Sequence, residues 1–121
     1  MTTPLQQAVQ STFADHGPLA QAAEGFVARD GQMRLAEAVA RTIEPGGVLV
    51  AEAATGVGKT FAYLVPALLS GERVLLSTAT KTLQDQLFGR DLPRLARALG
   101  VPVRTALLKG RSSYLCLHRL E

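Results

Sequence analysis

The segment that most constrains this chain is the octapeptide AATGVGKT at residues 53–60, which lies between apolar runs at residues 48–51 and 61–69. Glycines let a backbone curl until successive N–H groups point inward at an anion such as phosphate. The pair Lys59-Thr60 supplies a positive charge for the β- and γ-phosphates and a hydroxyl for Mg²⁺. The order of apolar strand, loop and helix therefore predicts a nucleoside triphosphate site, with the helix adding the positive end of its dipole.

All eight residues of the loop are candidate nucleotide ligands: Ala53, Ala54, Thr55, Gly56, Val57, Gly58, Lys59 and Thr60. Lys59 and Thr60 are the candidate catalytic residues, and Thr60 is the candidate Mg²⁺ ligand. The strict pattern G-x-x-x-x-G-K-[ST] would place glycine at position 53, where this chain has alanine. Alanine is acceptable there if its φ is negative, because only a positive φ demands glycine. The alternative is a glycine-rich turn that binds no ligand.

Strand-like and helix-like segments alternate around the loop. Short, nearly continuous apolar runs predict strands at residues 48–51, 73–77 and 103–108. Periodic apolar positions predict helices at residues 31–43, from residue 59 to residues 70–71, at 81–89 and from Pro93 to Gly100. Asp30 is suited to cap the first of these helices, and Pro66 to kink or end the second. This alternation predicts an α/β fold with a parallel sheet and flanking helices.

Residues 1–28 form a lead-in, in which Leu5, Val9 and Phe13 have helical spacing before His16-Gly17-Pro18 breaks the pattern. The N-terminus lacks the basic start and apolar core of a secretory signal. The apolar run at residues 61–69 is too short to span a bilayer. We therefore expect a cytoplasmic protein with no membrane partner.

Charge is unevenly placed along the chain. Residues 1–60 hold four basic and six acidic side chains, whereas residues 61–121 hold nine basic and four acidic ones. A basic C-terminal half suits an anionic polymer such as nucleic acid. Arginines that only decorate solvated helix faces would give the same balance.

A second cluster of polar residues, STATKTLQDQL at residues 77–87, follows the second predicted strand. Ligands bind at the carboxyl ends of strands in open α/β sheets, and hydroxyls at a helix start suit phosphate contacts. The alternative is a capped helix, with Thr80 as the N-cap and Leu83 and Leu87 packing inward. With the loop, this segment resembles motif Ia of superfamily-two helicases, which lines the track for a single strand. The candidate nucleic-acid ligands are Thr78, Thr80, Lys81 and Gln84.

The single cysteine, Cys116, lies in the sequence LLKGRSSYLCL at residues 107–117. A lone cysteine is normally a small buried apolar residue. In context, however, the segment resembles the L-K-G-R-x-N-Y-L-C-L stretch of iron–sulfur helicases of the XPD and DinG group, with Ser113 where asparagine is common. The resemblance implies that Cys116 is the first of four thiolates that hold a [4Fe–4S] cluster. The other three would lie beyond Glu121, since this chain supplies one cysteine.

The N-terminal part is similar to the YoaA-like branch of DinG-type helicases at Phe13, Gly17, Gly25-Phe26, Arg29 and Gln32. There, the Arg-x-x-Gln pair lies in a Q-motif-like position. A glutamine amide both donates and accepts, so Gln32 is a candidate reader of an adenine edge. Arg29 is the candidate to stack on the base or anchor the loop. The alternative for Gln32 is an exposed residue in the first helical turn.

The resemblance covers essentially the whole chain and implies an incomplete RecA-like P-loop NTPase domain. Residues 29–110 would be the N-terminal part of the first helicase motor domain, and residues 111–121 the start of an iron–sulfur domain. The implied activity is ATP- and Mg²⁺-dependent, 5′-to-3′ unwinding of single-stranded or forked DNA in repair or replication, with a repair or replication protein as an additional partner. The chain stops in mid-element, which indicates a piece of a longer protein.

Two other classes of function remain open from the residues alone. One is a small P-loop kinase or nucleotide-binding module, although no lid or acceptor site is recognisable in residues 70–121. The other is a non-catalytic nucleic-acid adaptor in which the loop is structural. The chain contains no Asp-Glu-x-His segment after the loop, so we expect the chain alone to bind nucleotide weakly and to lack ATPase activity.

Overall fold

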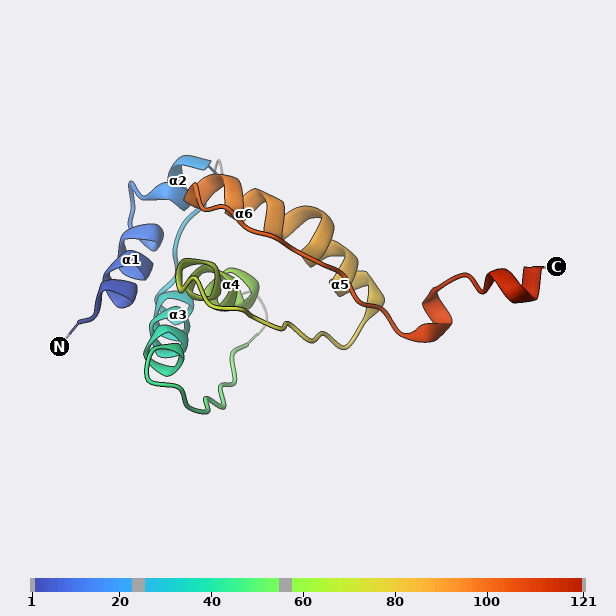
Figure 1. Cartoon of the computed structure of the whole chain (residues 1–121). Helices are drawn as coiled ribbons and strands as arrows, with labels where there is room; N and C mark the ends of the chain where they lie inside the picture. Colours follow the sequence, from blue (N-terminus) through green and yellow to red (C-terminus); the bar gives the residue numbers. More distant parts are fainter. Residues whose placement is uncertain (1, 23–25, 55–57, 121) are drawn as a thin grey trace.

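The computed structural model describes residues 2–22, 26–54 and 58–120, and Figure 1 shows its helices. Thr55, Gly56 and Val57 of the predicted loop lie outside the described residues. The described helices are α1 (Pro4–Phe13), α2 (Pro18–Ala22), α3 (Asp30–Ile43), α4 (Lys59–Leu69), α5 (Lys81–Gln86), the π-helical η1 (Leu87–Asp91), α6 (Leu92–Leu99) and the 3₁₀ segments η2 (Arg111–Ser113) and η3 (Leu117–Leu120).

The helices before and after the loop form close to where the sequence predicts them. In α1 the Thr3 hydroxyl accepts from the Gln6 amide at 3.2 Å, and Pro4 follows at a position where a missing N–H costs nothing. Helix α3 begins one residue earlier than predicted. Arg29 is its N-cap without a side-chain bond, and Asp30 lies in the first turn, where its charge favours the helix dipole.

Helix α4 continues through Pro66 to Leu69, so the proline does not end the helix. The Ser70 amide still donates to the Pro66 carbonyl at 3.0 Å, and the Ser70 hydroxyl donates to the Ala67 carbonyl. Pro66 is fully buried, as are its neighbours Leu64 and Val65. The apolar burial on both sides of the proline offsets the backbone bond that it cannot donate.

Helices α5, η1 and α6 run on as one continuous rod (Figure 1) where the sequence predicts two separate helices. The Leu92 amide donates to the Leu87 carbonyl, which is the wider i→i+5 spacing of a π turn. Because Pro93 has no N–H, the wide turn just before it lets the backbone continue without the missing bond. The rod then ends at Gly100, whose φ of +66° is left-handed, as in a common helix C-cap.

The core lies where α1, α3 and α4 pack together, with α2 and α6 closing one side. Its buried apolar residues are Val9, Phe13, Leu19, Ala36, Ala40, Ala62, Leu64, Val65, Leu87 and Leu95. Phe26 lies between the rings of Phe13 and Phe61, with centroid distances of 6.4 and 6.3 Å. Among the helices described, none is long and apolar enough to cross a membrane.

The predicted parallel sheet is wrong: the described residues contain no β-strand. Residues 48–51, 73–77 and 103–108 lie outside the helices and pair with no strand, and Figure 1 shows the first two as long connecting segments beside the helices. Val48, Val50 and Leu75 are 92, 93 and 91% exposed. A strand that is apolar on both faces needs paired neighbours and helices over both faces. Here the helices bury their apolar faces against one another instead.

Candidate functional site

The start of α4 carries the described end of the predicted phosphate loop. Gly58 is the N-cap of α4, with φ 84° and ψ 43° in the left-handed region. Its carbonyl accepts the first bond of the helix, from the Ala62 amide at 3.2 Å. Lys59 and Thr60 are the first two helical residues, and Lys59 is exposed while Thr60 is half-buried. Their amides belong to the group at a helix start that finds no partner within the helix.

The chain enters the loop through Ala53 and Ala54. No described non-glycine residue has a positive φ, so the φ of Ala53 is negative, as an alanine at this position requires. Ala53 is half-buried and Ala54 is exposed. The condition under which alanine can replace the first glycine of the strict motif is therefore met.

Gln32 of α3 is brought against the loop end from 26 residues away in the sequence. Its side-chain Nε2 donates to the Gly58 carbonyl at 3.1 Å, and the residue is only 4% exposed. A Cβ placed on residue 58 would overlap this nitrogen. Glycine at position 58 is therefore favoured by its left-handed φ, and an added Cβ would also displace the Gln32 amide from the Gly58 carbonyl.

Arg29 lies one turn before Gln32, at the N-cap of α3. Its side chain is exposed, and its carbonyl accepts from the Met33 amide at 3.0 Å. The chain thus places Arg29 and Gln32 at the end of α3 that adjoins the start of α4, as a site for a base beside a phosphate loop would require.

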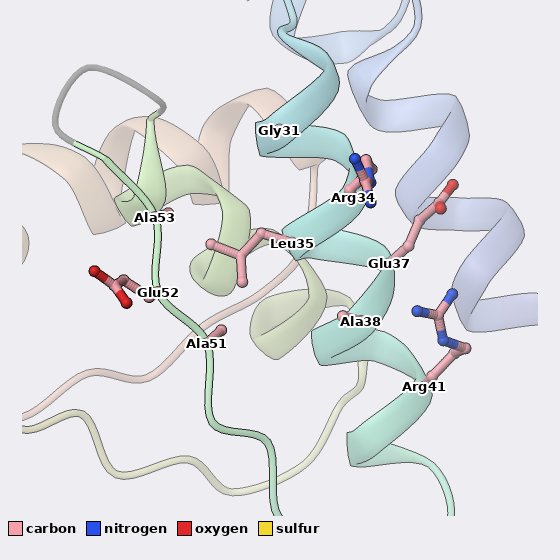
Figure 2. A pocket seen from close by; sticks show the side chains of 9 residues that line it. All are labelled: Gly31, Arg34, Leu35, Glu37, Ala38, Arg41, Ala51, Glu52 and Ala53. Carbon is pink, nitrogen blue, oxygen red and sulfur yellow. The ribbon is translucent and has the colours of Figure 1, made fainter.

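A groove of about 620 Å³ lies between α3 and the extended residues that lead into the loop. Figure 2 shows Leu35 projecting toward the segment that leads into the loop. Arg34, Glu37 and Arg41 project from the other side of α3, and Glu52 projects away from α3. Glu37 is tied to α1 because its carboxylate accepts from Gln10 Nε2 at 3.0 Å. The charged groups do not converge, so the groove offers no polar cradle for a triphosphate.

The candidate nucleic-acid ligands lie at the start of α5, where three of the four, Thr78, Thr80 and Gln84, already have partners. Thr80 caps the helix, because its hydroxyl accepts from the Leu83 amide at 3.1 Å. The Thr78 hydroxyl donates to the Thr80 carbonyl at 3.4 Å. Lys81 is exposed at the first position of the helix. Thr80 therefore caps the helix, as the capped-helix alternative predicts. Because Thr80 is exposed, its cap does not block a phosphate from the first turn.

Gln84 is joined to the segment that leads to the cysteine. Its Nε2 donates to the Leu108 carbonyl at 2.7 Å. Beside it, Lys109 Nζ is 2.7 Å from a carboxylate oxygen of Asp85, and the Lys109 amide donates to the Tyr114 hydroxyl at 2.8 Å. Gln84, a candidate nucleic-acid contact from the sequence, thus uses its amide nitrogen on the protein's own backbone.

Cys116 is exposed and lies between η2 and η3. Among the described residues no three His, Cys, Asp or Glu side chains gather closely enough to hold a metal ion. His118 is also exposed. These residues do not by themselves fit an iron–sulfur cluster, which needs four thiolates.

Sequence reasoning missed the contacts that link distant segments. Nothing local to Gln84, Asp85 or Lys109 indicates that they pair. For the Gln32 bond one signal was available in the sequence: a glycine at a helix start exposes a carbonyl that a neighbouring helix can bind. That signal points to Gly58 as the acceptor, but it does not indicate that Gln32 is the donor.

Comparison with known proteins shows the family to which the chain belongs. The sequence profile of the DEAD/DEAH box helicase family matches residues 33–120. The chain is 55% identical over 109 residues to the ATP-dependent DNA helicase YoaA of Escherichia coli, which covers 90% of the chain and 17% of that protein. It is 44% identical over 125 residues to the ATP-dependent helicase DinG of Mycobacterium tuberculosis, covering 97% of the chain and 19% of the relative.

A third relative, the 3′-5′ exonuclease DinG of Bacillus subtilis, is 38% identical over 107 residues, with 85% of the chain and 12% of the relative covered. The chain thus spans less than a fifth of the length of these curated relatives. No solved structure matches it. The family match extends over most of the chain and includes the loop, the start of α5 and the segment around Cys116. The chain belongs to the DEAD/DEAH box helicase family.

Proposed function

We propose that this chain carries the nucleotide site and part of the DNA track of an ATP-dependent DNA helicase. The observation that supports this most is the arrangement at the start of α4, where a left-handed Gly58 is followed by Lys59 and Thr60 as the first helical residues. Relatives that share this segment are named ATP-dependent DNA helicase or ATP-dependent helicase. The kinase and adaptor alternatives have no comparable support.

The proposed chemistry is phosphoryl transfer to water. Lys59 binds the β- and γ-phosphates, and the positive end of α4, whose first amides have no acceptor within the helix, favours the negative charge of the triphosphate. The Thr60 hydroxyl is an oxygen ligand of the kind that Mg²⁺ prefers, and its half-buried position at the helix start fits that role. ATP with Mg²⁺ supplies the γ-phosphoryl group whose hydrolysis drives the motor. Ala53 to Val57 complete the loop in this proposal.

Recognition of the adenine base is assigned to Arg29 and Gln32. The Gln32 amide uses one N–H on the Gly58 carbonyl, and a glutamine amide has a second N–H and an oxygen with which to meet a base edge. Arg29 is exposed on the same end of α3, where a guanidinium plane can stack on a base.

Contact with the phosphate backbone of DNA is assigned to Thr78, Thr80, Lys81 and Gln84. The basic C-terminal half of the chain favours such an anionic partner. The strand is single-stranded or forked DNA, and the direction of movement is 5′-to-3′, which rests on the family resemblance. Gln84 is the weaker contact of the four, because its Nε2 already donates to the Leu108 carbonyl.

Cys116 is proposed as one of four thiolates of a [4Fe–4S] cluster. Its exposure on the described surface is compatible with a ligand role, but the described residues hold no cluster of three or more metal-binding side chains. No step of ATP hydrolysis is derived through the cluster. In the full-length protein, Cys116→Ser should lower the bound iron and the visible absorption of the cluster, whereas unchanged iron content would remove Cys116 from the proposed ligand set.

The remaining organisation is part of the same proposal. Residues 1–28 are a lead-in, residues 29–110 belong to the first motor domain, and residues 111–121 begin the iron–sulfur domain. A cytoplasmic location and a partner from DNA repair or replication follow from the proposed substrate.

DNA-stimulated ATP hydrolysis tests the proposed function directly. In the full-length protein, Lys59→Ala should abolish hydrolysis and unwinding while single-stranded DNA still binds, because the lysine acts on the phosphates alone. Arg97→Ala, which removes an exposed cation from the last turn of α6, is the control and should leave hydrolysis intact. Full DNA-stimulated hydrolysis by Lys59→Ala would refute the proposal.

A further inference from the structure

We propose that Gln32 positions the phosphate loop by fixing the direction of the peptide between Gly58 and Lys59. This role is separate from any contact that Gln32 makes with a base. It rests on the proposed nucleotide site, since the peptide concerned lies directly before Lys59. The observation that carries it is the bond from Gln32 Nε2 to the Gly58 carbonyl at 3.1 Å.

The planarity of the peptide makes this bond consequential for ligand binding. In a trans peptide the C=O and the following N–H point in opposite directions. When Gln32 holds the Gly58 carbonyl toward α3, the Lys59 N–H is therefore directed away from α3. That N–H is one of the first amides of α4, which have no acceptor within the helix. An N–H so directed is a donor prepared for an anion.

The surroundings of Gln32 make it a fixed support. The residue is 4% exposed, and it lies on α3, which packs along α4. The Gly58 carbonyl accepts from both Gln32 and the Ala62 amide, at 3.1 and 3.2 Å, so one oxygen is held from two sides. Removing the Gln32 amide would leave the Gly58 carbonyl with only the Ala62 donor, and the Gly58–Lys59 peptide would then be held less firmly.

A reader of adenine and a support of the loop respond differently when the base changes. Loss of a base contact weakens the binding of ATP alone, because GTP presents a different edge and tripolyphosphate has no base. Loss of the support weakens all three ligands, since each binds through its phosphates, and loss of a base contact adds a further loss for ATP alone. Gln32 is a positioning residue in this account, and the loss shared by GTP and tripolyphosphate is its signature.

The test measures the dissociation constants of Mg–ATP, Mg–GTP and Mg–tripolyphosphate for the full-length protein. Gln32→Met keeps the length of the side chain and removes the donor, and it should weaken all three ligands by about three- to tenfold. The matched control is Gln21→Met, which removes an exposed glutamine whose Nε2 donates to the His16 carbonyl at 2.9 Å, and it should change none. A loss confined to ATP, or no loss, would overturn the inference.

Gln32→Glu separates positioning from packing. The introduced carboxyl donates to the Gly58 carbonyl only when protonated, so the affinity of this variant for Mg–tripolyphosphate, relative to Gln32→Met, should rise as the pH falls from about 8 to about 5.5. A flat ratio across that range would contradict the proposed donor role. Taking the ratio of the two variants cancels the protonation of the ligand itself.

Lys59→Ala distinguishes a failure of this inference from a failure of the proposed function. If Lys59→Ala weakens binding of Mg–tripolyphosphate and Gln32→Met does not, the inference alone is overturned. If the unaltered protein binds none of the three ligands, both are overturned. If the Gln32 variants do not fold, the inference is tested by NMR on the unaltered protein with labelled glutamine. The side-chain amide signals of Gln32 should shift on adding Mg–tripolyphosphate, and those of Gln21 should not. Unshifted Gln32 signals would overturn the inference.

Discussion

At the scale of single residues, glycine at position 58 is determined by two separate requirements. Its φ of +84° lies where side chains are strained, and a Cβ there would overlap Gln32 Nε2. The sequence pattern predicts the first requirement, because glycine before Lys-Thr is part of the loop motif. The second could not be predicted, since it depends on how α3 packs against α4.

Gly58→Ala should therefore impair nucleotide binding beyond its effect on backbone strain. The matched control is Gly46→Ala, because Gly46 has a similar φ of +74° and a Cβ added there would meet no atom within 4 Å. Both changes should lower the free energy of unfolding by about 1–2 kcal/mol. Isothermal titration with Mg–ATP should show weaker binding for Gly58→Ala alone. Equal affinities for the two variants would contradict the role given to position 58.

At the scale of elements, most helices were predictable, whereas the predicted strands do not form. The spacing of Leu5, Val9 and Phe13 and the breaker at Gly17-Pro18 locate α1 and its end to within a few residues. A helix is specified by its own residues, whereas a strand requires a partner elsewhere in the chain. The apolar runs at residues 48–51 and 73–77 indicate a preference for strand, but they cannot indicate pairing, and the structure lacks that pairing.

The packing of α4 into the core should carry much of the stability of the described helices. Val65 on α4 is fully buried, and Val27 before α3 is 76% exposed, so the same truncation to alanine can be compared at both. Val65→Ala should lower the free energy of unfolding by roughly 2–3 kcal/mol, through lost burial and the cavity left behind. Val27→Ala should change it by less than about 0.5 kcal/mol. Urea denaturation of the chain gives both values, and similar values would argue against the core described.

The first turn of α5 offers a way to separate capping from DNA contact. Aspartate caps a helix as well as threonine does, and it repels a phosphate backbone. Thr80→Asp should therefore keep the thermal midpoint of the full-length protein and weaken its binding to single-stranded DNA, more strongly at low salt. Gln7→Glu adds the same charge to the exposed face of α1 and serves as the control. Unchanged DNA affinity in Thr80→Asp would limit Thr80 to capping.

At the scale of the whole molecule, the described chain leaves large apolar side chains in water. Val48, Val50, Leu75 and Leu108 are 92, 93, 91 and 81% exposed, and Leu115 and Leu117 follow at 72 and 74%. Exposed apolar surface of this extent promotes association. The family profile and the relatives show what the chain belongs to, and the arrangement of its helices alone would not have shown it.

The chain on its own should accordingly bind a hydrophobic dye and self-associate. Replacing Val48, Val50 and Leu75 with lysine should reduce dye fluorescence and the associated fraction measured by light scattering, because charges remain in water and repel. Replacing the buried Leu64 would unfold the core and raise the fluorescence instead, which makes Leu64→Lys the contrasting control. A monodisperse chain that binds no dye would contradict the exposure of these segments.

The most direct measurement of the central claim is hydrogen exchange at the start of α4 in the full-length protein, with and without saturating Mg–ATP. If Lys59 and Thr60 hold the triphosphate, the amides of residues 58–62 should exchange more slowly with the ligand present, because phosphate oxygens accept from the first amides of the helix. The protection should disappear in Lys59→Ala. Amides that exchange at the same rate with and without Mg–ATP would show that the triphosphate does not bind there.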